Sequence, residues 1–524
     1  MSPDDSAAPA RAEAGTLVEA RRNRLLRQVD WRFLLPSARP AVVCCLTGGE
    51  VAEACALFAE RLVAPREAAP GSCDLVVCAR GDRLAIQRGT ALLRPGGCLY
   101  AESHGQLSGE LRHAGLAQVR SLIRWPATER AEAFIPAYAP EVREYVERLV
   151  LRSTPGRLAR ARAAVGRFVT RSSTPADQCV IARRASDGAE PLYAEPFWLA
   201  EARNAWPPSR QAAASRKLTT ALLTRGPRSI SKVIALIFAA EERSPGVIVK
   251  LPRVPESDSG LAREARALRQ VGGRLPGIPR LLFHLERDGV PAVGEDAIDA
   301  TPLGARLWRR TFARGVDDGA DWLARLAGLA SERAGAGAIV EAALADFARN
   351  FGRVVDPALL AEARATLRQL GELPVVAEHR DFSPWNVGRM LEGGALAVFD
   401  WESSEPRGVP GPDLVYFLAH MAFHLDGALG REASHAVTSY RRLLDRSTFT
   451  GGVAARAAER YAAAVGIDAT LWRPLRTLTW LVHTRSDHAR LVADAGGEPT
   501  DAALRTSTFL QLLEAEMRAE APTW

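Results

Sequence analysis

Two acidic residues and an amide follow one another at short spacings in the last third of the chain. Asp381 lies in the stretch His-Arg-Asp-Phe-Ser-Pro-Trp-Asn, Asn386 ends it, and Asp400 follows in Val-Phe-Asp-Trp-Glu. Phosphoryl transfer from a nucleotide needs an Asp that orients the attacking hydroxyl, and an Asn and a second Asp that hold Mg²⁺ on the phosphates. Mg²⁺ favours oxygen ligands and usually binds one or two protein groups. The pattern H-x-D-x-x-x-x-N…D therefore predicts nucleotide-dependent phosphoryl transfer.

Lysine is scarce in this chain, and its positions indicate a second functional region. Of 68 Lys and Arg residues only Lys217, Lys232 and Lys250 are Lys, and all three lie in one short segment. An ammonium is compact and flexible, whereas a guanidinium is planar and forked, so the two are not interchangeable at a site that uses their geometry. The lysine segment is therefore a candidate for contact with phosphate.

The elements around these residues predict a small sheet followed by a helical body. A turn separates the first two strand-like runs, and a helical stretch begins at Leu261 after the third. The apolar strand-like runs are residues 218–223, 233–238, 247–251, 280–285 and 292–298. Beyond Leu303 the pattern is mostly helical, broken by the signature loop and its hairpin. We expect a two-lobed α+β domain, with an N-lobe over residues 213–302 and a helical C-lobe over residues 303–520.

Residues 213–515 resemble the aminoglycoside phosphotransferase and choline kinase-like family, whose members are small-molecule relatives of the protein kinases. The resemblance rests on the form H-x-D-F-x-x-x-N with a downstream D-W-E. It implies a protein-kinase-like fold and Mg²⁺/ATP-dependent transfer of the γ-phosphate to a hydroxyl of a metabolite, sugar or antibiotic-like acceptor. GTP in place of ATP stays open, and so does the identity of the acceptor.

The resemblance also assigns roles to single residues. Asp381 would be the catalytic base or hydroxyl-positioning group, and Asn386 and Asp400 would hold Mg²⁺. Lys250 matches the strand lysine that contacts the α- and β-phosphates, and Glu264 on the following helix would fix its ammonium by a charge-assisted hydrogen bond.

Three further residues match the turn that covers the phosphates in the family: Ser229, Ser231 and Lys232. A loop of this kind cradles phosphate through free backbone N–H groups and is usually rich in glycine. This turn has one glycine, Gly226. Its hydroxyls would take over part of the work, and an ordinary hairpin explains the same residues equally well.

Two residues beside the signature have a structural interpretation. His379 is expected to pack the loop and to hydrogen-bond backbone. Asp413 either caps the helix that follows it or, as the resemblance implies, braces the catalytic loop from below.

The first third of the chain alternates strand and helix signals. Apolar runs at residues 41–46, 73–78 and 98–101, a helical pattern over residues 50–62 and a turn at residues 92–97 predict a parallel sheet covered by helices. The runs Asp-Leu-Val-Val and Leu-Arg-Pro-Gly-Gly resemble two parts of the class I methyltransferase domain. The glycine loop is poor, and the segment between the first two runs is too short for two more strands. We therefore predict a truncated, degenerate Rossmann-like domain over residues 26–185 and argue against S-adenosylmethionine as a cofactor.

Bulk properties bound the remaining choices. With 524 residues the chain should form two or three domains, and we expect a frayed tail or short helix at residues 1–25 and a linker at residues 186–212. Apolar residues make up 47% and charged residues 25%, which is typical of a globular protein. The net charge of +7 is scattered, so nucleic acid is not an expected partner. The sequence has no run long enough for a membrane span, and a cytoplasmic location is expected. The seven cysteines form no C-x-x-C pair and are predicted to be reduced and buried.

Two alternatives to a small-molecule kinase remain open at this point. One is a non-catalytic module that still binds a nucleotide or another ligand. The other is a bifunctional methyltransferase–kinase. The oligomeric state is open as well.

Overall fold

The computed structural model describes residues 7–79, 81–103, 107–125, 131–153, 178–185, 195–206, 217–226, 228–240, 242–330, 332–495, 497–519 and 524. The chain divides into two compact units. The first, here called the sheet unit, consists of Ala20–Ala265 and Arg280–Ala297. The second, here called the helical unit, consists of Met1–Glu19, Arg266–Pro279 and Ile298–Trp524.

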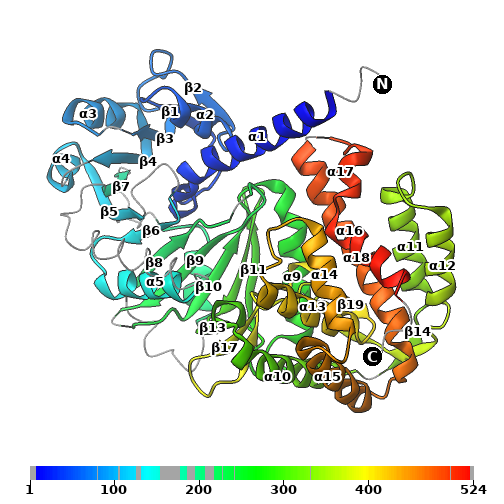
Figure 1. Ribbon diagram of the computed structural model, residues 1–524. Coiled ribbons are helices and arrows are strands. Elements are labelled where there is room, and N and C mark those ends of the chain that lie inside the picture. The colour runs from blue at the N-terminus through cyan, green and yellow to red at the C-terminus, as the bar shows by residue number, and fades with distance from the viewer. Residues whose placement is uncertain are drawn as a thin grey trace. The chain divides into compact units, whose positions relative to one another are not determined.

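The sheet unit is built on one mixed sheet with the strand order β11-β12-β10-β9-β8-β6-β5-β7-β4-β3-β1-β2 (Figure 1). Its strands in the described residues are β1 (Val42–Cys45), β2 (Arg61–Val63), β3 (Cys73–Cys78), β4 (Leu93–Ser103), β5 (Leu116–Trp125), β6 (Ala133–Pro136), β7 (Gln178–Arg184), β8 (Leu218–Leu223), β9 (Val233–Ala239), β10 (Val247–Leu251), β11 (Leu281–Arg287) and β12 (Val290–Asp296).

At one end of this sheet β2, β1, β3 and β4 pair in parallel. This agrees with the parallel sheet predicted from the alternation of strands and helices. Helices α2 (Glu50–Ala56) and α3 (Arg83–Leu92) follow β1 and β3, and α4 (Ser108–His113) follows β4. From β4 onward the pairs β4–β7, β5–β7 and β5–β6 are antiparallel.

Two details of the first third differ from the prediction. The helix expected over residues 50–62 ends at Ala56, and Leu62 lies in the short strand β2, because a brief apolar run fits helix and strand equally well. The turn expected at residues 92–97 is part of β4, where Gly96 adopts a φ of 78° and the register shifts against β3. An irregularity of this kind lets a strand continue through a glycine.

The other end of the sheet is the antiparallel group β8 to β12, and its five strands occur where the apolar runs predict them. Strand β6 pairs with β8 through Ala133 opposite Leu223 and Phe134 opposite Leu222. The two ends are therefore one continuous sheet rather than two separate ones, and a single cluster of buried side chains spans both. All seven cysteines are free and buried, as expected.

The N-terminal segment and the expected linker are ordered where they are described. Helix α1 (Ala7–Gln28) runs beyond the expected tail and leads into the 3₁₀ turn η1 (Asp30–Leu34), whose residues are all buried. Of the expected linker, residues 195–206 contain α7 (Leu199–Asn204) and the buried Trp198, whose Nε1 donates to Phe33 O at 3.2 Å. The rest of the linker lies outside the described residues. Helices α5 (Pro140–Ser153) and α9 (Asp258–Val271) and the turn η3 (Pro255–Ser257) complete the elements used below.

The helical unit is a bundle with a few short strands (Figure 1). Helix α13 is apolar on almost every face and lies in its core, as expected for a central helix. The helices are α10 (Arg309–Ala327), α11 (Gly337–Phe351), α12 (Pro357–Leu367), α13 (Pro412–Asp426), α14 (Ala433–Leu444), α15 (Phe449–Val465), α16 (Trp472–Ala495), α17 (Asp501–Arg505) and α18 (Thr508–Met517).

The strands of the helical unit are more numerous than the single hairpin that the sequence predicts. One small sheet has the order β13 (Ala300–Pro302), β17 (Val387–Met390), β18 (Leu396–Val398). Two further pairs are β14 (Arg333–Gly335) with β15 (Glu372–Pro374), and β16 (Val376–Glu378) with β19 (Glu405–Gly408). Strands of three or four residues carry too little periodicity to be recognised. None of the helices that the structure describes combines the length and apolar character that crossing a membrane requires.

Candidate active site

The β17–β18 hairpin brings the signature residues of the helical unit together. Val387 pairs with Val398, and the turn at Gly393 and Gly394 has φ angles of 70° and 67° that glycine adopts without strain. Asn386 directly precedes β17 and Asp400 follows β18, with Phe399 N donating to Asn386 O at 2.9 Å. The thirteen residues between Asn386 and Asp400 are thus folded back so that the two lie at the same end of the hairpin.

Asp381 is held by two hydrogen bonds from side chains. Asn386 Nδ2 donates to Asp381 Oδ2 at 2.7 Å and to its carbonyl oxygen at 3.0 Å, and Tyr416 OH donates to Oδ1 at 3.2 Å. Burial, and then the charge of Asp400, raise the pKa of Asp381 to about 7 against the opposing effect of the two hydrogen bonds. Asp381 and Asp400 repel each other when both are ionised, so a cation bound between them would be stabilising.

The backbone is strained at two positions of the site, next to Asp381 and at Asp400. Arg380 and Asp400 have φ angles of 61° and 66°, in the left-handed region, which costs a non-glycine residue on the order of 1–3 kcal/mol. Asp413 holds the first of them, because its carboxylate accepts from His379 N at 2.6 Å and Arg380 N at 2.8 Å. Burial, and then the charge of Glu378, raise the pKa of Asp413 to about 7. The sequence left open whether Asp413 caps the helix or braces the catalytic loop. The N-cap of α13 is Gly411, and the Asp413 carboxylate binds the loop backbone, so the bracing contact is the one that forms.

His379 packs the loop, as interpreted from the sequence. It is fully buried, its ring lies 4.7 Å from that of Trp401, and Nδ1 accepts from Asp381 N at 3.2 Å. Because Nδ1 accepts, Nε2 donates to Phe399 O at 2.8 Å. The imidazole therefore joins the Asp381 loop to the end of the hairpin through its two nitrogens.

The donor atoms next to Asp381 fit a magnesium ion. The amide nitrogen of Asn386 is directed at Asp381, which leaves the amide oxygen as the atom able to bind a cation. Asp400 contributes a carboxylate, and an amide and a carboxylate oxygen are ligands that Mg²⁺ accepts alongside water and phosphate. The described residues contain no group of three or more His, Cys, Asp or Glu side chains placed to hold a metal, so a site here would take its remaining ligands from elsewhere.

A second polar centre lies in the sheet unit around Glu264 of α9. Lys250 Nζ hydrogen-bonds Glu264 Oε1, and Lys232 Nζ lies 3.3 Å from Glu264 Oε2. Lys250 Nζ also lies 3.1 Å from Glu295 Oε1 on β12. Lys217, the third lysine, is exposed, with Nζ 5.2 Å from the ring centroid of Tyr138. Two of the three lysines thus converge on one buried carboxylate.

Glu295 belongs to this centre and was missed by sequence reasoning. It is 2% exposed, and burial raises its pKa to about 7, with Lys250 opposing and Glu264 reinforcing the rise. The pairing of β10 with β12 places it, because Ile248 stands opposite Glu295 and Lys250 opposite Val293. The one sequence signal was the acidic pair Glu295-Asp296 at the end of an apolar run. Acidic residues at such a place more often mark the exposed end of a strand than a buried charge.

Replacing Glu295 with Gln should make stability less dependent on pH. The folded-state pKa of about 7 lies above the usual 4.5, so protonated Glu295 stabilises the fold at low pH and this contribution is lost as the pH rises through about 7. Gln stays neutral throughout. Between about pH 5 and about pH 8 the free energy of unfolding of the variant should rise by on the order of 3 kcal/mol relative to that of the original chain. Thermal melts at both pH values measure this, with Glu53→Gln at an exposed ion pair as the control. Parallel pH profiles for the two chains speak against the interpretation.

The turn between β8 and β9 carries the remaining predicted residues, and Lys232 ends it. Ser229 is 1% exposed, and Ser231 Oγ accepts from Arg228 N at 3.3 Å. Gly226 has a φ of 119°, and a Cβ there would lie 2.3 Å from the Ser231 side chain, so this position requires glycine. The Ser231 hydroxyl therefore supports the turn itself, and contact of these residues with a phosphate remains a prediction.

Tyr416 is the other functional candidate that the sequence did not indicate. It lies on α13, and its ring stacks on His483 of α16 with centroids 4.0 Å apart. Burial lowers the pKa of His483 well below its usual value and that of the neighbouring His420 to about 4. Asp381 is therefore flanked by an aromatic and neutral-imidazole surface, which no local motif predicts.

Comparison with known proteins gives distant structural likeness only. No family model matches the chain, and no curated protein does. It is similar to an aminoglycoside-3'-phosphotransferase of type VIII, with 17% identity over 46% of this chain and 88% of that one and a TM-score of 0.28. It is similar to the aminoglycoside phosphotransferase APH(3'')-Id of Streptomyces rimosus, solved with ADP and streptomycin, with 17% identity, 47% and 90% coverage and a TM-score of 0.30.

A third solved structure is the spectinomycin phosphotransferase APH(9)-Ia in complex with ADP and spectinomycin. It is 11% identical, with 57% of this chain and 92% of that one covered and a TM-score of 0.29. None of the matches supports the methyltransferase-like interpretation of the first third. These TM-scores are low, so the matches show a distant likeness and no more.

Proposed function

We propose that the chain is a phosphotransferase that moves the γ-phosphate of ATP to a hydroxyl of a small molecule. The observation that carries the proposal is the partly buried Asp381, which accepts hydrogen bonds from Asn386 and Tyr416 and interacts with the charge of Asp400. The backbone strain at Arg380 and Asp400 adds support, since such strain persists where function requires it. The proposal assigns residues 213–520 to a two-lobed, kinase-like domain.

The proposed mechanism assigns each polar centre a part of one reaction. The Lys250 ammonium, oriented by Glu264, offsets charge on the α- and β-phosphates. Asp381 accepts a hydrogen bond from the attacking hydroxyl and aligns its oxygen with the γ-phosphorus. Asn386 and Asp400 would hold Mg²⁺, which when bound neutralises charge on the β- and γ-phosphates.

Atoms and charge balance in this scheme. The bond from the acceptor oxygen to the γ-phosphorus forms, the bond from that phosphorus to the β–γ bridging oxygen breaks, and ADP leaves. The hydroxyl proton passes to an oxygen of Asp381 and from there to solvent. A strong base is not needed, because a loose transition state depends more on alignment and charge neutralisation than on proton abstraction.

The direct test is a screen for acceptor-dependent ADP release. Purified full-length chain is incubated with ATP and Mg²⁺, and in parallel with GTP and Mg²⁺, against a library of aminoglycosides, choline-like alcohols, sugars and amino alcohols. The proposal expects at least one hydroxyl compound to raise nucleoside diphosphate release, and its phosphorylated form to appear by mass spectrometry. Nucleotide binding without turnover for any compound favours the non-catalytic alternative.

A thermal-shift measurement separates the remaining alternative, because a ligand that binds the folded chain raises its apparent stability by mass action. ATP with Mg²⁺ should raise the melting temperature, and S-adenosylmethionine should leave it unchanged. We retain a degenerate Rossmann-like scaffold as the proposal for residues 26–185, which the parallel pairing of β2, β1, β3 and β4 supports. Stabilisation by S-adenosylmethionine would favour a bifunctional enzyme instead.

A further inference from the structure

The side chain of Arg253 is the centre of a buried hydrogen-bond network in the sheet unit. Arg253 lies shortly after β10, the strand that carries Lys250, and its side chain has no exposed surface. Nε donates to both carboxylate oxygens of Asp30 at 3.2 and 3.0 Å, and Nη1 donates to Asn23 Oδ1 and Arg228 O, each at 3.1 Å. Nη2 donates to Thr224 O at 2.9 Å and lies 3.0 Å from Asp30 Oδ2. Every nitrogen of the guanidinium thus has an acceptor.

The ion pair between Asp30 and Arg253 is fully buried on both sides. Burying two charges is costly, and the cost is offset only when the remaining donors and acceptors are satisfied, as they are here. Arg32 adds to the network by donating to Arg253 O at 2.7 Å. The network is therefore a rigid, specific connection between the N-terminal segment and the segment that follows the strand of Lys250. Unlike a surface ion pair, it is stable only if all of its hydrogen bonds form together.

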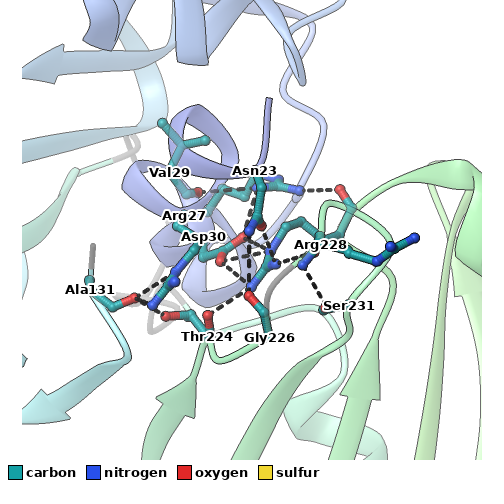
Figure 2. Close-up of polar contacts among 11 residues, drawn as sticks. Asn23, Arg27, Val29, Asp30, Ala131, Thr224, Gly226, Arg228 and Ser231 are labelled. Atoms are coloured by element: carbon teal, nitrogen blue, oxygen red, sulfur yellow. Dashed lines mark hydrogen bonds and ion pairs between the residues drawn. The ribbon is translucent and has the colours of Figure 1, made fainter. Parts of the chain in front are cut away.

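The network ends on the turn between β8 and β9. Figure 2 shows Asn23 and Asp30 on one side and Thr224, Gly226, Arg228 and Ser231 on the other, joined by dashed contacts. The Arg253 guanidinium donates to the carbonyl oxygens of Thr224 and Arg228, the residues two positions before and after Gly226. Asn23 Nδ2 donates to Gly226 O itself at 3.4 Å.

The start of the turn has a further attachment. Thr224 Oγ1 donates to Ala131 O at 2.8 Å, and Arg27 Nη2 donates to the same carbonyl at 2.9 Å (Figure 2). The carbonyls of Thr224, Gly226 and Arg228 thus all accept hydrogen bonds from Asn23 of α1 or from Arg253, which is itself paired with Asp30 of η1. Asn23 precedes Gly226 by 203 residues, and Asp30 precedes Arg253, which contacts the turn directly, by 223 residues.

We propose that residues 23–32 act, through Arg253, as a positioning element for the β8–β9 turn, and that they pre-organise it to bind nucleotide phosphates. This rests on the proposed function. A turn with a single glycine lacks the freedom to close around a ligand after it arrives, and a loop already held in place avoids the entropic cost of ordering during binding. Asp30, Asn23 and Arg253 are positioning residues, because they act through the turn and contact no ligand themselves.

The test compares Asp30→Asn with the original chain and uses ATP with Mg²⁺ as the ligand. Calorimetric titration well below the melting temperature should show roughly tenfold weaker binding, which corresponds to the ordering cost of one or two side chains. Hydrogen exchange should become faster in peptides spanning residues 218–239 and stay unchanged in the helical unit. A merely structural role would lower the melting temperature without changing the affinity of the folded chain.

Two more variants keep the test decisive. Asn23→Ala removes one acceptor of Arg253 and the bond to Gly226 O but leaves the buried ion pair, so it serves if Asp30→Asn does not fold. Glu53→Gln is the control. It breaks the exposed ion pair between Glu53 of α2 and Arg21, which lies on α1 like Asn23, and it should change neither the affinity for ATP with Mg²⁺ nor hydrogen exchange at the turn.

Each result decides the inference. Faster exchange at the turn together with weaker binding supports it. Unchanged binding in the Asp30 and Asn23 variants overturns it, whether or not the turn exchanges faster. If the original chain binds no nucleotide, the proposed function fails, and the exchange data alone decide the positioning role: faster exchange confined to residues 218–239 upholds it, and unchanged exchange refutes it.

Discussion

Replacing Asp381 with Asn is expected to reduce kcat for phosphoryl transfer by roughly 1,000-fold, the range in which loss of a general acid–base group falls. Asn has nearly the same shape and can still take a hydrogen bond from Tyr416, so the loop should keep its conformation. It cannot accept the hydroxyl proton and aligns the acceptor oxygen poorly. Acceptor-dependent ADP release measures the loss, and calorimetric titration with ATP and Mg²⁺ should show a dissociation constant changed by less than about threefold.

Asp317→Asn is the matched control for this experiment. Asp317 is also an aspartate of the helical unit, but its carboxylate is half exposed and pairs at the surface with Arg460 at 2.7 Å. A surface pair of this kind contributes about 1 kcal/mol or less, so kcat should remain at the original value. A kcat within tenfold of the original in Asp381→Asn would exclude the proposed role of this carboxylate.

The parts of the fold that the sequence predicts well are short apolar runs with turn-forming residues on both sides. The five strands β8 to β12 were expected within a few residues of their observed bounds for this reason, and helix α9 was expected from its helical pattern. The continuity of the sheet was not expected. It depends on β6 pairing with β8, and pairing between segments that are far apart in sequence leaves no local pattern.

The candidate site divides in the same way. Asp381, Asn386 and Asp400 could be predicted because one loop and one hairpin hold all three, so their spacing in sequence fixes their neighbourhood. Lys250 and Glu264 needed a family resemblance, and the structure brings their side chains into contact. Glu295 and Tyr416 depend on register and packing between separate elements, which single-sequence reasoning cannot supply.

The N-terminal segment is the clearest case of this limit. Residues 1–25 are rich in Ala, Arg and Glu, so the sequence predicts no more than a frayed tail or short helix there. The importance of the N-terminal segment comes from Asp30 and Asn23 meeting Arg253 across 223 and 230 residues. A buried charge pair has no periodicity, and each partner alone is more often a surface residue.

Replacing Lys250 with Met should have two separable effects. It removes the cation proposed to bind the α- and β-phosphates, so affinity for ATP with Mg²⁺ should fall by roughly 100-fold, about 3 kcal/mol. It also leaves Glu264 and Glu295 buried with Lys232 as the cation still seen beside them, which should destabilise the fold by about 3–5 kcal/mol. Because the pKa of Glu295 is raised to about 7, this carboxylate is ionised at about pH 8 and mostly neutral at about pH 5, so the variant should lose more melting temperature at the higher pH. Lys217→Met, at the exposed lysine, should match the original chain in both measurements, and calorimetry on folded Lys250→Met that returns the original affinity would remove Lys250 from the phosphate site.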